Sequence, residues 1–117
     1  MKYLLLCQIR PAEFADIPKS AEEKMMADMM VYHRQLIQAG VLVAAGQLAD
    51  PDTAQRVFSS DGHIKTQAGA ALAGEVQIGG YYLLDVPGEA EATGWAAKCP
   101  LAQVGSLEVR QVAYSPL

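Results

Sequence analysis

The sequence predicts an α+β fold for a single domain that spans residues 1–117. Two kinds of pattern support this prediction: apolar runs of strand length, and segments bounded by helix start and stop signals. The order of these segments is a third observation. Twice along the chain, a helix follows one strand and precedes the next. A chain of this length forms one modest core, and dimerisation often adds stability to domains of this size.

The first strand and helix are the best defined elements. "KYLLLCQI" (2–9) is a continuous apolar run, which is typical of a strand covered on both faces. "SAEE" then predicts a capping box, in which Ser20 and Glu23 cap a helix over 21–39. Apolar side chains recur along it at helical spacing, at Met25, Met29, Tyr32 and Leu36. Gly40 is placed to end the helix in a left-handed conformation.

The remaining segments complete a recognisable order. They are a strand "VLVAAGQL" (41–48), a hairpin "RVFSS-DG-HIKT", a strand "GGYYLLDV", a short helix from Pro87 that Pro100 stops, and a strand "SLEVRQVA" (106–113). This order is the split β-α-β pattern of ferredoxin-like folds, with a β-hairpin inserted between the halves. In such folds both helices cover one face of the sheet. Strands without a polar face therefore predict a homodimer that covers the other face.

Composition excludes several classes of function. The formal charge is −4 and no basic cluster occurs, which argues against nucleic acid as a partner. The apolar start of the chain is too short for a signal peptide or a membrane span, so we expect no membrane association. Two cysteines make no disulfide framework, and we expect reduced thiols and a cytoplasmic location. With no Cys/His cluster and no dinucleotide fingerprint, we expect no metal and no cofactor.

Six segments that occur in a fixed order carry a family resemblance. They are "YLLL", "YHRQLIQAGVLVAAGQL", "RV" before the hairpin turn, "GGYYLLDV", "WAAKCP" and "GSLEVRQV". Over roughly residues 2–113 the chain resembles the YCII-related superfamily, and within it the DGPF-domain branch. The resemblance implies a ferredoxin-like dimeric α/β barrel. It implies no settled activity.

The chain departs from the family pattern at two places. The Asp-Gly-Pro-Phe stretch that names the branch falls on residues 68–71, where only Gly69 remains. The superfamily is also thought to use a histidine on the first helix and an aspartate before the proline that ends the second. The resemblance places these positions at Met29 and Cys99, so the His–Asp pair that suits acid/base catalysis is not intact.

The remaining candidates for a site are His33, Met29, Tyr32, Tyr81 and Cys99. His33 lies one helical turn after Met29 and is either a base that faces a pocket or a boundary residue of the helix stripe. Tyr81 and Tyr82 point to opposite faces of their strand, so one packs under the helices and the other faces the space between sheets. The residues expected to contact a small apolar or aromatic ligand are Met29, Tyr32, Tyr81 and Cys99.

The leading functional interpretation is a small cytoplasmic homodimer with a ligand pocket and no catalytic pair. One alternative is a cofactor-free lyase or isomerase for an aromatic or lactone-like compound, with His33 or Tyr81 as acid/base. Whether the chain is an enzyme stays open, and the missing pair counts against it. Another alternative is an accessory protein in regulation by extracytoplasmic-function sigma factors.

The stretch "TQAGAALAGE" (66–75) consists mostly of small side chains. Few buried contacts hold such a segment, so its local stability is expected to be low. We expect residues 67–76 to form a mobile flap over the pocket, with Leu72 as its apolar anchor. A simple linker into the tyrosine strand is the alternative.

Overall fold

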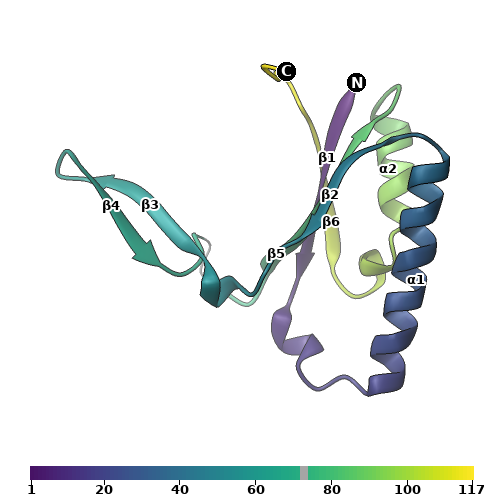
Figure 1. Ribbon diagram of the computed structural model, residues 1–117, viewed down its shortest axis with the longest axis horizontal. Helices are drawn as coiled ribbons and strands as arrows, with labels where there is room; N and C mark the ends of the chain where they lie inside the picture. The colour runs from purple at the N-terminus through teal and green to yellow at the C-terminus, as the bar shows by residue number, and fades with distance from the viewer. Residues whose placement is uncertain (72–73) are drawn as a thin grey trace.

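The computed structural model of the protein describes residues 1–71 and 74–117. Its main sheet has four strands, β1 (Lys2–Ile9), β2 (Leu42–Gln47), β5 (Gln77–Asp85) and β6 (Ser106–Gln111), in the order β2-β5-β1-β6. All neighbouring strands of this sheet run antiparallel. Two helices, α1 (Lys19–Gln38) and α2 (Glu89–Lys98), lie on the same side of the sheet (Figure 1). The predicted α+β class is thereby confirmed.

Strand alternation gives the sheet two unlike faces. On the helix face, Tyr3, Leu5 and Cys7 of β1 are buried beside Tyr82 and Leu84 of β5. The core is completed by Tyr32 and Leu36 of α1, by Ala92 and Ala96 of α2, and by Cys99, which directly follows α2. The helices cover one face of β1, and the expected cover of its other face by a second subunit stays a prediction. The other face, here called the open face, carries the half-buried side chains of Leu4, Leu6, Tyr81 and Leu83.

The predicted capping box is wrong. The helix α1 begins at Lys19, its N-cap is Pro18, and no side chain caps it. The carbonyl oxygen of Pro18 accepts from the backbone N–H groups of Ala21 and Glu22 instead. The ring of Pro18 fixes its φ, here at −58°, and Pro18 becomes the N-cap of α1. The helix therefore already includes Ser20, which cannot serve as a cap.

The ends of the helices follow backbone rules. Gly40, with φ +71°, terminates α1 as predicted. The second helix starts at Glu89, two residues later than the sequence suggested, because Gly88 is still extended. Three short 3₁₀ segments connect these elements: η1 (Pro11–Phe14), η2 (Pro51–Thr53) and η3 (Pro100–Gln103). No helix within the described ranges is long and apolar enough to cross a membrane.

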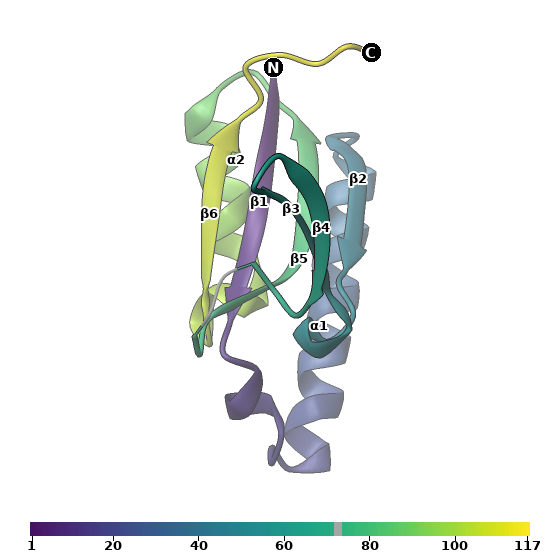
Figure 2. The same cartoon turned by 90° about the vertical axis from the view of Figure 1, so that its left-hand side faces the viewer.

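The predicted hairpin is confirmed and stands apart from the main sheet. Strands β3 (Gln55–Ser60) and β4 (His63–Ala68) pair with each other and, among the described residues, with no other strand. Asp61 and Gly62 have φ values of 52° and 77°, the signature of a type I′ turn. The hairpin projects on the side of the sheet opposite the helices, in front of the open face (Figures 1 and 2).

The start of the predicted flap is strand instead of loop. Gln67 and Ala68 belong to β4, where they pair with Arg56 and Gln55. The N–H of Gly69 then donates to the carbonyl oxygen of Ala54, which closes the hairpin at its base. Leu72, the expected anchor of the flap, lies outside the described residues.

Candidate functional site

His33 and Tyr82 form a hydrogen-bonded pair on the helix face of the sheet. The helix α1 directs the imidazole toward β5, where Nε2 lies 2.7 Å from the phenol oxygen of Tyr82. Tyr82 is buried and His33 is half-buried. Tyr32, also on α1, packs edge-on against Tyr82 with ring centroids 5.6 Å apart. Its hydroxyl donates to the carbonyl oxygen of Trp95 at 2.8 Å, which ties this cluster to α2.

Burial sets the protonation of the two phenols. Removal from water, with a smaller contribution from Cys99, raises the pKa of both Tyr32 and Tyr82 above the ordinary value for tyrosine. Tyr82 therefore keeps its proton at neutral pH. Tyr82 donates to Nε2 when the imidazole carries its proton on Nδ1, and accepts from Nε2–H when the proton is on Nε2. The direction of the hydrogen bond is thus tied to the tautomer of His33.

The two positions that the resemblance assigned to a His–Asp pair belong to the packing of the hydrophobic core. Met29 packs against the hydrophobic core, and Cys99 is buried within it. Cys99 forms a hydrogen bond with the Cys7 thiol, which together with burial raises the pKa of Cys7. Both thiols are 1% exposed and free. Neither position offers an acid or base with access to solvent.

Tyr81 lies on the open face, so the sheet separates it from the other candidates. Its ring lies over Gly46 of β2, where an added Cβ would come within 2.9 Å of the ring carbon Cε1. Leu6 of β1 is its cross-strand neighbour. The prediction that the two adjacent tyrosines face opposite sides is confirmed. The sequence interpretation did not pair Tyr82 with His33, because alternation alone does not tell which of the two tyrosines lies under the helices.

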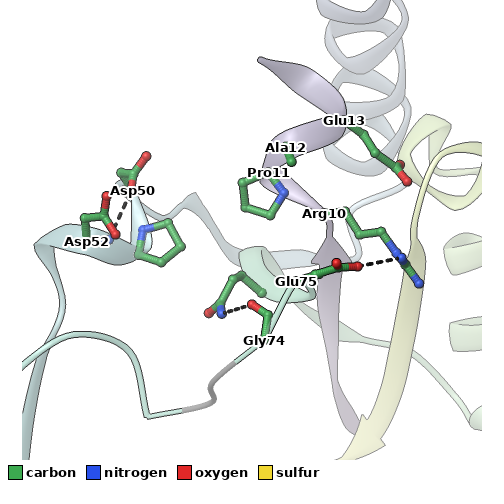
Figure 3. A pocket seen from close by; sticks show the side chains of 10 residues that line it. Arg10, Pro11, Ala12, Glu13, Asp50, Asp52, Gly74 and Glu75 are labelled. Atoms are coloured by element: carbon green, nitrogen blue, oxygen red, sulfur yellow. Dashed lines mark hydrogen bonds and ion pairs between the residues drawn. The ribbon is translucent and has the colours of Figure 1, made fainter. Parts of the chain in front are cut away.

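A cavity of about 480 Å³ lies apart from these residues, at the start of β5 near Gln77. Its walls come from η1, η2 and the segment that leads into β5 (Figure 3). Four carboxylates line it, those of Glu13, Asp50, Asp52 and Glu75, and Arg10 pairs with Glu75 at 3.2 Å. None of the site residues predicted from the sequence lines this cavity. Among the described residues, no group of three or more His, Cys, Asp or Glu side chains could hold a metal ion.

A sequence model of the YCII-related domain matches residues 1–114. The chain belongs to the YCII-related family. An uncharacterized protein of Rhizobium meliloti (strain 1021) is 29% identical to it over 119 residues, which cover 99% of this chain and 96% of that protein. The similarity therefore extends over the whole length of both proteins. It brings no assigned activity with it.

This YCII-related chain thus offers two distinct sets of chemical groups. On the helix face, His33 is a half-buried imidazole that is hydrogen-bonded at Nε2 to a protonated phenol. On the open face, the Tyr81 ring lies among aliphatic side chains with its hydroxyl beside the small residue Gly46. The first set suits proton transfer. The second suits contact with an apolar surface.

Proposed function

We propose that this YCII-related protein is a cytoplasmic homodimer of the ferredoxin-like dimeric α/β barrel type, with a site for a small apolar or aromatic molecule and no catalytic pair. The observation that carries the proposal is the open face. Leu4 lies opposite Leu83, and Leu6 opposite Tyr81, so four large side chains form one apolar patch. Patches of this kind on soluble proteins mark interaction sites.

The rim of the open face fits the same interpretation. Glu108 and Arg110 of β6 lie beside Leu6 and Leu4 and form an ion pair at 3.0 Å. An apolar centre with a charged border is the usual anatomy of a protein interface. Two free, buried cysteines also fit the reducing conditions of the cytoplasm.

Membership of the DGPF-domain branch is part of the proposal. The glycine retained from the branch motif, Gly69, has a φ of +112°, which side chains other than glycine rarely adopt. It directly follows β4 and closes the hairpin. This supports a turn-forming role for the motif, which explains how its other residues can change to alanine without loss of the fold.

Tyr81 is the proposed contact for the ligand. It combines an aromatic ring with a hydroxyl, and an aromatic ring of this kind binds apolar molecules while the hydroxyl gives orientation. Small neighbours leave room beside it, since Gly46 and Ala44 are the β2 residues opposite Tyr81 and Leu83. In a dimer that faces sheet to sheet, this space is shielded from water.

Tyr81→Ala is expected to weaken binding of an aromatic probe by about tenfold or more, the equivalent of one lost aromatic contact. Titration of the dye 1-anilinonaphthalene-8-sulfonate, followed by fluorescence, measures this affinity. Tyr114→Ala is the matched control, because Tyr114 is 81% exposed near the end of the chain. Equal affinities of the two variants would refute the Tyr81 site.

A second candidate function is a cofactor-free lyase or isomerase, and the His33–Tyr82 pair favours it. When Nε2–H donates to the phenol oxygen of Tyr82, Nδ1 of the neutral imidazole keeps a free lone pair, as a general base requires. Tyr82 acts here as a positioning residue. The substrate would approach the half-exposed edge of His33.

If this activity exists, His33→Ala should lower the rate of isomerisation of a lactone by about 100-fold, the usual contribution of a general base. α-Angelica lactone in D₂O is a suitable probe, since NMR follows both isomerisation and deuterium uptake. His63→Ala is the matched control, because His63 is exposed beside the hairpin turn. Tyr82→Phe should shift the pH profile of the rate. Full turnover by His33→Ala would exclude His33 as the base.

A further inference from the structure

The β3–β4 hairpin lacks the support that its structure needs. It forms a two-stranded sheet of its own and pairs with no other strand of the described chain. An isolated hairpin of two strands is at best marginally stable in water. A surface that packs on the hairpin would supply the missing stability.

The two faces of the hairpin are chemically different. Alternation and register place Val57 and Ile64 on one face, where they are 67% and 74% exposed. The other residues of this face are uncharged: Gln55, Ser59, Thr66 and Ala68. On the opposite face the Arg56 guanidinium covers the Phe58 ring at 5.1 Å from its centroid. Phe58 therefore has a cover, whereas Val57 and Ile64 have none among the described residues.

The position of the hairpin indicates what covers Val57 and Ile64. Both views of the fold show the hairpin on the side of the sheet opposite the helices, in front of the open face (Figures 1 and 2). Any molecule that covers the open face is therefore flanked by the hairpin. A second copy of this chain seated there lies within its reach.

The charge of the hairpin also favours a second copy of this chain as its partner. The hairpin carries the cationic side chains of Arg56 and Lys65 and one carboxylate, Asp61. The whole chain has a formal charge of −4, so the surface outside the hairpin is net negative. Arg56 and Lys65 lie on the face opposite Val57 and Ile64, so they border the contact instead of entering it, and their positive charge favours approach to a net negative subunit.

We propose that the β3–β4 hairpin is a dimer arm, whose Val57–Ile64 face packs against the second copy that covers the open face. The arm rests on the homodimer of the proposed function. In a two-fold dimer each subunit receives the arm of the other, so the contact occurs twice. The arm thus extends the interface beyond the sheets and stabilises an otherwise isolated hairpin.

Photo-cross-linking tests the contact directly. The full-length protein with p-benzoylphenylalanine in place of Ile64 is expected to give a cross-linked band of twice the subunit mass on a denaturing gel. The same group in place of Lys65 is the matched control, because the next residue of a strand points to the opposite face. A dimer in solution that gives no such band from position 64 overturns the arm.

The affinity of the dimer provides a second measurement. Val57→Asp combined with Ile64→Asp is expected to raise the dimer Kd about tenfold or more, measured by sedimentation equilibrium. Ser60→Asp combined with Gln67→Asp adds the same charge to the opposite face and is expected to change the Kd much less. Equal effects of the two pairs would overturn the arm and leave the dimer standing. A wild-type chain that is monomeric at micromolar concentration would instead remove the homodimer itself.

Discussion

Leu83→Glu is expected to convert the proposed homodimer into a folded monomer. Leu83 lies on β5 between Leu4 of β1 and Ala44 of β2, at the middle of the open face. Its neighbours in sequence, Tyr82 and Leu84, are buried under the helices. The substitution therefore leaves the core intact and places a carboxylate in the proposed apolar contact between sheets.

The size of the effect follows from desolvation. An unpaired charge buried in an apolar interface costs several kcal/mol, and a two-fold dimer buries two of them. We expect the dimer Kd to rise by about 1,000-fold or more, which is about 4 kcal/mol. Sedimentation equilibrium gives the Kd, and circular dichroism shows whether the monomer is folded.

Thr93→Glu is the matched control for this experiment. Thr93 is exposed on α2, on the other side of the sheet, and the substitution adds the same negative charge to the chain. We expect it to leave the Kd unchanged. A dimer that tolerates Leu83→Glu as well as Thr93→Glu would place the interface elsewhere and refute the sheet-to-sheet arrangement.

Elements with strong local signals could be predicted from the sequence. The Asp61-Gly62 turn and the end of α1 at Gly40 depend on positive φ values, which few residues adopt, so the residue type alone marks them. The start of α1 was missed because two signals compete there. A capping serine was present, yet Pro18 fixes the backbone two residues ahead of it.

The coverage of the sheet could not be predicted in the same way. A strand such as β1 is apolar at every position from Tyr3 to Cys7, so its sequence does not tell which face the helices cover. That choice depends on where α1 and α2 pack, which is a tertiary property. Only the structure shows that Leu4 and Leu6 are left on the open face.

The candidate site was predicted in part. Strand alternation correctly separates Tyr81 from Tyr82, but it does not tell which of them lies under the helices. Their assignment depends on the register of β5 against β1, which shifts between Cys7 and Gln8 at a bulge. The hydrogen bond between Tyr82 and His33 therefore had no signal in the sequence that was local to either residue.

Leu36→Ala is expected to destabilise the protein far more than Ile37→Ala. Leu36 is fully buried in the core, one turn after Tyr32, whereas Ile37 is 63% exposed on the same helix. Removal of a buried leucine side chain costs the transfer free energy of its carbons and leaves a cavity, together about 2–5 kcal/mol. At the exposed position we expect a change within about 0.5 kcal/mol, since little burial is lost.

Urea unfolding at one fixed protein concentration measures both values, because the apparent stability of any protein that dimerises depends on its concentration. The two variants remove side chains of the same size from adjacent positions of one helix. Effects on helix propensity and on the unfolded state are therefore nearly matched, and the difference in burial remains. Their difference reports how α1 is rotated against the sheet. This rotation also directs His33, three residues before Leu36, toward Tyr82. Equal costs at the two positions would mean that α1 presents a different face to the core, and the His33–Tyr82 pair would then be absent.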